Sequence, residues 1–263
     1  MNEGVIAVRI KLIACKALFR EISYLCATSP NAVDVTWMRQ GYHNRPEQLK
    51  AWLQREIDQI EAGEDPHTLQ VGADTETGVD GDFDAIVMGY GLCSNATAGL
   101  AARKHRLVIP RAHDCITLLL GSKERYAQLF HELPGCFWYS ASWLENARMP
   151  GEATRNREIA RYEAMGYDEE TIKYLLEELG GLGNYDKAAY IRTPFLNNES
   201  YQAATREAAA FYGWQYREVE GETGLLRRMI DGDWDSEDFL VLEPGETAVA
   251  TGEADIIRAS APR

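Results

Sequence analysis

The chain has 263 residues, of which 45% are hydrophobic and 26% are charged, and its formal net charge is −14. This composition is typical of a soluble globular protein and gives enough residues for one large α/β domain or two small lobes. The acidic balance excludes nucleic acid as an expected partner, because phosphate binding needs a basic surface. No apolar run is long enough to span a membrane and no signal-peptide pattern opens the chain, so we expect a cytoplasmic protein.

The five cysteines are an odd number in a chain with no export signal. A disulfide framework is therefore not expected. Metal binding, redox chemistry and simple burial are the roles that remain open for them. Cys26, on an apolar helix face, and Cys136, at the start of an aromatic strand, are expected to be core residues.

The first half of the chain reads as alternating strands and helices. Residues 9–15 form an apolar strand that runs into a helix beginning at Lys16, and residues 32–38 alternate like a second strand. A strongly amphipathic helix is predicted over 46–62. The acidic, Gly/Thr/Asp-rich segment 63–81 is predicted to be a loop.

Cysteines stand at the ends of three strands in this half. The first strand ends at Cys15, the strand that begins at Asp84 runs to Cys93, and the strand that begins at Arg106 leads into a turn that contains Cys115. In an open parallel sheet the carboxyl ends of the strands face one crevice, where α/β proteins bind ligands. We therefore expect the three cysteines to converge.

The second half repeats the layout of the first. Residues 146–182 read as a charged helical insert or lid with a break at 166–168, where Asp168 is expected to cap the second helix. The other predicted elements are strands at 136–140, 188–193, 214–219 and 238–242 and helices at 200–212 and 224–230.

This order predicts an α/β fold of two Rossmann-like lobes with mainly parallel sheets, a helical insert and a cleft between the lobes. We place an N-terminal lobe at residues 1–145, the helical insert at 146–185 and a C-terminal lobe at 186–263. No cysteine follows Cys136 in the sequence, so we expect any binding of soft metals to take place in the first lobe.

The site hypothesis rests on Cys15, Cys93, His113 and Cys115. Thiolate and imidazole ligands suit zinc first and iron, including an iron–sulfur cluster, second. Helix N-termini behind the cysteines are expected to lower their pKa values and favour the thiolate. The alternative for each cysteine is burial in a strand as a small apolar residue.

Other polar residues are expected to border the same crevice. Lys16, Asn95 and Arg111 are candidates for orienting a cofactor or substrate, although solvation explains each of them as well. Asp114 is at least as well explained as the cap of the following helix. The turn from Gly89 to Asn95 lacks the pattern of a dinucleotide site and is interpreted as a place of close backbone approach to a ligand.

Three motifs carry a family resemblance: Ala14-Cys15-Lys-Ala-Leu-Phe, Tyr90-Gly-Leu-Cys93-Ser-Asn95 and Ile109-Pro-Arg-Ala-His113-Asp-Cys115. Together with the closing Gly232-Asp-Trp234 they resemble the prokaryotic family called domain of unknown function sixteen thirty-eight. Ser94 stands where that family more often has glycine. Its members are often encoded among corrinoid-dependent methyltransferases, so the resemblance implies a role near corrinoid chemistry.

The resemblance sharpens the metal hypothesis by analogy. Zinc enzymes that pass methyl groups from corrinoids to thiols are similar in using a His-x-Cys pair and a distant Cys, which His113 and Cys115 with Cys93 or Cys15 would supply. The leading hypothesis is a zinc- or iron-binding protein, possessing metal-dependent methyltransferase activity or serving a step of corrinoid-linked one-carbon transfer. Its expected partner is a small-molecule substrate or a corrinoid protein, and the sequence identifies neither catalytic residues nor an oligomeric state.

Two alternatives come from other classes of protein. The first is a non-catalytic accessory protein that binds a corrinoid, a tetrapyrrole or a small metabolite. The second is a redox protein that uses Cys93 and Cys115 as a dithiol.

Overall fold

The computed structural model describes residues 8–64, 82–177, 181–196, 198–252 and 255–260. The chain divides into two compact units, each considered by itself below. The first unit combines Met1–Lys123 with Thr223–Arg263, and the second unit is Glu124–Glu222. The chain therefore leaves the first unit, builds the second and returns.

A mostly parallel sheet forms the centre of the first unit, with strand order β2-β1-β3-β4-β8. The first four strands are parallel, whereas β8 runs antiparallel to β4. Long apolar runs form the central strands because both faces of the sheet are covered. The strands are β1 (Arg9–Cys15), β2 (Ala32–Met38), β3 (Ala85–Gly89), β4 (Arg106–Pro110) and β8 (Phe239–Leu242).

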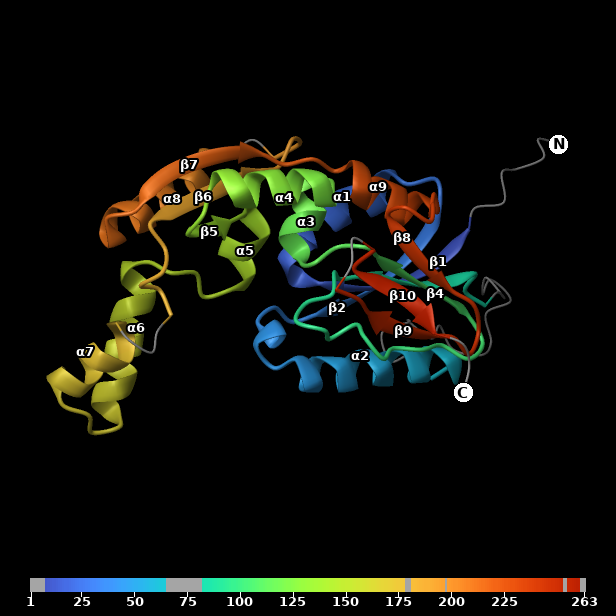
Figure 1. Ribbon diagram of the computed structural model, residues 1–263, viewed down its shortest axis with the longest axis horizontal. Coiled ribbons are helices and arrows are strands. Elements are labelled where there is room, and N and C mark those ends of the chain that lie inside the picture. Colours follow the sequence, from blue (N-terminus) through green and yellow to red (C-terminus); the bar gives the residue numbers. More distant parts are fainter. Residues whose placement is uncertain (1–7, 65–81, 178–180, 197, 253–254, 261–263) are drawn as a thin grey trace, which may run out of the picture. The chain divides into compact units, whose positions relative to one another are not determined.

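Helices cover the two faces of this sheet. Figure 1 shows α2 (Pro46–Glu61) on one face and α1 (Phe19–Thr28) with α9 (Gly224–Asp231) on the other. The helix α2 begins at Pro46, as its amphipathic pattern predicts, and buries one apolar side. Three short helices follow strands or turns: η1 (Lys16–Leu18), η2 (Tyr42–Asn44) and α3 (Cys115–Leu120). Two further strands, β9 (Thr247–Ala250) and β10 (Ile257–Ser260), pair as an antiparallel hairpin.

Side chains of α2 anchor the segment that leads into β4. Gln54 exchanges two hydrogen bonds with the backbone of Ala101, at 2.9 and 3.1 Å. The carboxylate of Glu61 accepts backbone N–H groups from Arg103, Lys104 and His105. Burial alone would raise the pKa of Glu61, but these three donors together lower it. The start of β4 is thereby fixed to the helix on the adjacent face.

The second unit has its own parallel sheet, with strand order β5-β6-β7. Its strands are β5 (Cys136–Tyr139), β6 (Lys187–Arg192) and β7 (Gln215–Glu220), and its helices include α4 (Lys123–Glu132), α5 (Ala141–Asn146) and α8 (Glu199–Tyr212). Alanines on α8 allow it to pack closely against β6 and β7. Tyr139 and Tyr190 fill the core between them.

Two helices correspond to the predicted insert, α6 (Glu152–Ala164) and α7 (Glu169–Glu177). The predicted break is confirmed, because α6 ends before Gly166, whose φ is 86°. The predicted cap is also confirmed, since a carboxylate oxygen of Asp168 accepts the backbone N–H of Thr171 at 2.8 Å.

The units divide the chain differently from the predicted lobes. The strand β5, which we placed in the N-terminal lobe, pairs with β6, and β8, which we placed in the C-terminal lobe, pairs with β4. Residues 145 and 185, the predicted boundaries, both lie inside the second unit. Both strands are short and largely buried, so their own patterns fit either sheet. The α/β class and the mainly parallel sheets are confirmed, the β9–β10 hairpin was not predicted, and the cleft between lobes stays a prediction.

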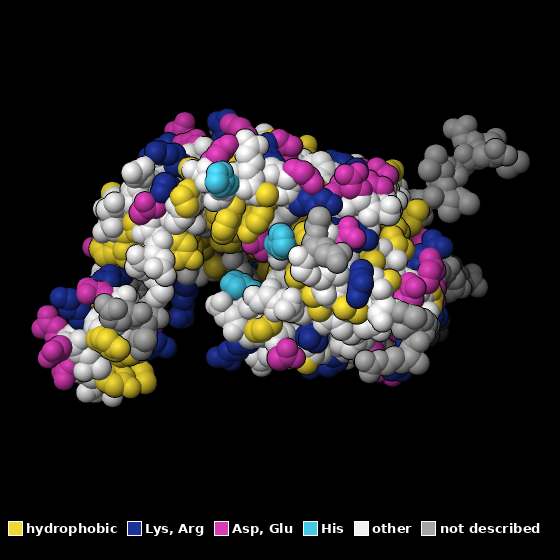
Figure 2. Space-filling model, in the orientation of Figure 1, with side chains coloured by type: hydrophobic (Ala, Val, Ile, Leu, Met, Phe, Trp, Pro, Cys, Tyr) yellow, Lys and Arg dark blue, Asp and Glu magenta, His cyan; other side chains and the backbone are white. Residues whose placement is uncertain are grey.

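The predicted loop 63–81 lies outside the described residues from 65 onward. Among the helices that the structure describes, none combines the length and the apolar character that a bilayer crossing requires. Figure 2 shows basic side chains interspersed with acidic ones on the visible surfaces, and the net charge remains strongly negative.

Candidate functional site at the strand ends

The candidate site lies at the carboxyl ends of β1, β3 and β4, which are neighbours in the first sheet. The chain passes from β1 outward to β2 on one side, then returns to place β3 on the other side of β1. This reversal is a topological switch point, the place where open α/β sheets bind ligands. The convergence of strand ends that the sequence predicts is therefore confirmed.

The loops after β3 and β4 continue the pairing of these two strands. The N–H of Leu92 donates to the carbonyl of Ala112 at 2.7 Å, and the N–H of Cys93 donates to the carbonyl of His113 at 2.9 Å. A Cβ atom on Gly91 would lie 2.7 Å from both the Ala112 oxygen and the Asp114 nitrogen. Glycine at this position lets the two loops touch and brings Cys93 beside the turn that carries Cys115.

Three consecutive residues in the first of these loops adopt the left-handed conformation. Their φ angles are 46° at Cys93, 58° at Ser94 and 68° at Asn95. Each such residue other than glycine costs on the order of 1–2 kcal/mol. Backbone strain of this kind is concentrated at functional sites, where surrounding contacts hold it in place.

Asp114 organises the second loop. One of its carboxylate oxygens accepts the N–H groups of Ile116 and Thr117, at 3.0 and 3.1 Å. It is therefore the N-cap of α3, the role that the sequence offered as an alternative to ligand contact. The cap fixes Cys115 as the first residue of that helix.

The three thiols lie within electrostatic reach of one another. Negative charge on Cys15 raises the pKa of Cys93, and negative charge on Cys93 and Cys15 raises the pKa of Cys115. Cys15 and Cys93 are buried, while Cys115 keeps some exposed surface. The sulfur of Cys15 accepts the N–H of Ala17 at 3.5 Å. All five cysteines are free thiols, Cys136 is buried as expected, and Cys26, which we also expected in the core, is only partly buried.

Tyr90 is the site residue that the sequence analysis missed. It follows β3 directly and stands opposite Cys15, because Ala14 pairs with Gly89 in the parallel register. Its side chain is only 3% exposed and lies in reach of all three thiols. Its hydroxyl stands beside Cys15 but makes no hydrogen bond of ordinary geometry within the described residues. A tyrosine in an apolar strand end carries no sequence signal that separates such a group from a core aromatic residue.

The expectation that helix N-termini lower the pKa values of these thiols is wrong. Burial is the largest influence and raises the pKa of Cys15, Cys93 and Cys115. For Cys15, the N–H of Ala17 and the hydroxyl of Tyr90 only partly offset this effect. Short helices carry a small dipole, so removal of water from the sulfur atoms dominates.

The remaining predicted residues lie in different surroundings. The side chain of His113 is exposed, and it is the backbone carbonyl of this residue that joins the two loops. Lys16 is half-buried at the start of η1, and Asn95 is exposed in the left-handed turn. Among the residues that the structure describes, no three His, Cys, Asp or Glu side chains are close enough to hold a metal ion. The structure thus gathers the thiols without assembling the predicted four-residue ligand set.

Arg111 is occupied by the C-terminal part of the first unit. Its guanidinium group donates to the backbone carbonyls of Ser236 and Asp255, each at 3.0 Å, and also to that of Ile257. The residue therefore ties the segment around β8 and β10 to the end of β4. This structural role accounts for its charge without a cofactor.

Replacing Ser94 by glycine should relieve the strain of the left-handed turn. We expect Ser94→Gly to raise the free energy of unfolding by about 0.5–1 kcal/mol, the left-handed penalty less the added entropy of the unfolded chain. Ser94→Ala keeps the Cβ atom and should change stability little. Urea unfolding of the three proteins measures this, and equal stability of all three would contradict the strain.

Gly91→Ala should have the opposite effect. Its Cβ atom would meet backbone atoms that cannot move independently, so we expect a loss of about 1–3 kcal/mol in the free energy of unfolding. Gly224→Ala is the matched control, because no atom lies within 4 Å of the added Cβ. If both variants lost the same free energy of unfolding, the contact between the loops would not be the cause of the loss.

The raised thiol pKa values predict slow alkylation and a loss of stability at high pH. A thiol whose pKa is raised in the folded state contributes stability that is complete below the unfolded pKa of about 8.5 and is lost as pH rises above it. The metal-free protein should lose about 1 kcal/mol per pH unit for each such thiol between about pH 9 and 11. Cys93→Ala should flatten this decline.

Alkylation is a second measurement of the same property. Iodoacetamide at pH 8 should modify the native metal-free protein at least about tenfold more slowly than the urea-unfolded chain, since the thiolate is the reactive form. Equal rates in both states would rule out protonated, buried thiols.

Comparison with known proteins places the chain in one family. No curated protein and no solved structure matches it. The family model described as protein of unknown function (DUF1638) matches residues 37–230, a span that includes Cys93, His113 and Cys115 and begins after Cys15. Because this span is well over half of the sequence, the chain belongs to the DUF1638 family.

Proposed function

We propose that the first unit contains a metal–thiolate centre in which Cys15, Cys93 and Cys115 bind zinc, with iron as the second choice. The observation that carries this proposal is the convergence of three thiols at the switch point of the sheet. Thiolates are ligands of zinc and iron rather than of magnesium or calcium.

The electrostatics of the site favour a cation. Burial and mutual repulsion both oppose the thiolate form of these cysteines. A divalent cation among the sulfur atoms would reverse both effects, because it replaces the protons and attracts each negative charge. The hydroxyl of Tyr90 would then have a charged acceptor within reach.

The donor set fits a soft metal by its chemistry, while the described side chains do not form three ligands around one point. In this proposal the thiol side chains turn toward the ion when it enters. His113, two residues before Cys115 in the same exposed turn, is the fourth ligand that we assign. Lys16 and Asn95 border the site as candidates for orienting a substrate.

The chemistry that we assign is a step of corrinoid-linked methyl or one-carbon transfer. Bound zinc would keep a thiolate nucleophilic at neutral pH, because the metal displaces the proton that burial otherwise retains. The link to corrinoids rests on the family resemblance alone. The same proposal includes a cytoplasmic location and a cleft between two Rossmann-like lobes. It also includes a small-molecule substrate or a corrinoid protein as the partner.

The test is elemental analysis of protein purified without oxygen. We expect about one zinc or iron per chain in the wild type, and loss of this metal in Cys93→Ser and Cys115→Ser with folding retained. Cys26→Ser is the matched control, because Cys26 lies on α1 away from the strand ends and should leave the metal content unchanged.

Full metal content in both site variants would overturn the proposal. So would a protein that takes up no metal under zinc or iron loading. Reversible loss of two titratable thiols in that metal-free protein would instead favour the dithiol function. A visible absorption change on adding cobalamin, equal in wild type and cysteine variants, would favour the accessory binding protein.

A further inference from the structure

A pocket in the second unit lies apart from the cysteines and is formed within that unit alone. Its volume is about 420 Å³, which is sufficient for a small organic ligand. It lies between the segment that joins α5 to α6 and one side of α8. Ala204 and Ala208 on α8 leave this space open because their side chains are small.

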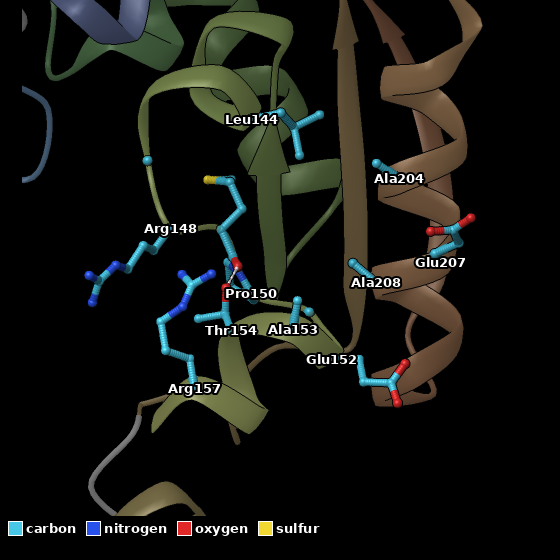
Figure 3. Close-up of a pocket in the computed structure, with 13 residues that line it drawn as sticks. Leu144, Arg148, Pro150, Glu152, Ala153, Thr154, Arg157, Ala204, Glu207 and Ala208 are labelled. Atoms are coloured by element: carbon cyan, nitrogen blue, oxygen red, sulfur yellow. Dashed lines mark hydrogen bonds between the residues drawn. The ribbon is translucent and has the colours of Figure 1, made fainter. Parts of the chain in front are cut away.

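Two arginines project on the same side of this pocket. Arg148 comes from the segment before α6 and Arg157 from α6 itself, and Figure 3 shows their guanidinium groups reaching toward one region. The side chain of Arg157 makes no hydrogen bond or ion pair with any described residue. Among the described residues, the guanidinium group of Arg148 forms one ion pair, with a carboxylate oxygen of Glu158 at 3.9 Å.

Glu158 does not neutralise this pair. Its other carboxylate oxygen lies 2.7 Å from Arg161, which does not line the pocket, so the closer of its two ion pairs is made with a residue outside this site. Two guanidinium groups on one side of a pocket repel each other when no anion lies between them, and an oxyanion there would attract both. The planar donors of arginine match carboxylate and phosphate oxygens.

The beginning of α6 supplies backbone N–H groups beside the pocket, while Glu152 in the same first turn adds one negative charge. This 13-residue helix has Gly151 as its N-cap, which supplies no side-chain acceptor to the first turn. The first N–H groups of a helix have no intrahelical acceptor, and its dipole favours an anion at this end. Thr154, which lines the pocket, donates its hydroxyl to the Met149 carbonyl at 2.7 Å and so fixes the loop that carries Arg148.

The rest of the pocket limits the class of ligand. Glu152 and Glu207 also line it, and Figure 3 places both carboxylates on the side away from the two arginines. Leu144 and the alanines of α8 provide apolar wall between these ends. A ligand therefore needs its negative group at the arginines and an uncharged or apolar body.

We propose that this pocket binds a small organic anion, a phosphate ester or a carboxylate, with Arg148 and Arg157 as the residues that hold its oxyanion. This inference is independent of the metal–thiolate proposal, because neither the residues nor the test involve the cysteines.

The test is isothermal titration calorimetry of the full chain with phenyl phosphate and, separately, benzoate, each an anionic group on an apolar body, at low ionic strength in a buffer without phosphate. We expect a Kd below about 1 mM for at least one probe, weakened at least about tenfold in Arg148→Gln and in Arg157→Gln. Tighter binding of phenyl phosphate assigns a phosphate ester, and tighter binding of benzoate assigns a carboxylate.

Arg217→Gln is the matched control for charge. Arg217 is exposed on β7 in the same unit, donates to Gln215 and Tyr216, and does not line the pocket. Binding in this variant should equal that of the wild type. No binding of either probe up to about 10 mM, or equal weakening in the control, would overturn the proposal. Circular dichroism of each variant confirms that a lost signal is not unfolding.

Discussion

The arrangement of the candidate site depends on the backbone contact between the loops that follow β3 and β4. Gly91 allows this contact because a Cβ atom there would collide with the backbone at Ala112 and Asp114. Two N–H···O bonds then hold the loops in register and carry Cys93 to the turn that contains Cys115. The left-handed turn that begins at Cys93 costs energy, and this contact is what holds it in place.

Burial decides the chemistry of the thiols once they have converged. Cys15 is buried at the end of β1 and Cys93 in the loop after β3, and negative charge on Cys15 opposes ionisation of Cys93. The metal-free site therefore favours neutral thiols, and a bound cation would favour thiolates. Tyr90 adds a buried hydroxyl without a hydrogen bond of ordinary geometry in the described structure. Packing of a hydrophobic core does not require these thiols and this hydroxyl group.

The first unit is completed by chain that follows the second unit. The strand β8 adds an antiparallel edge to a parallel sheet, and Arg111 holds the carbonyls of the segments around it. The second unit is therefore an insertion between α3 and α9, with a sheet and a pocket of its own. Our two proposals assign soft-metal chemistry to the first unit and anion binding to the second unit.

The sequence by itself determined most of the helices and strands but not the β9–β10 hairpin, because apolar periodicity and capping residues act locally. The bounds of β1, the break before Asp168 and the start of α2 follow from patterns within a few residues. It also placed Cys15 at the end of β1, since strand ends are local features, whereas the predicted strand end at Cys93 is wrong because β3 ends at Gly89 and Cys93 lies in the left-handed turn that follows. Tertiary structure alone decided that β5 joins β6 and that β8 joins β4, because short buried strands fit either sheet. Tertiary structure alone also decided that burial outweighs the helix dipoles in setting the pKa values of the thiols. The same holds for the hydrogen bonds of Arg111 to backbone carbonyls and for the position of Tyr90 beside Cys15. Each of these features depends on neighbours that are distant in sequence.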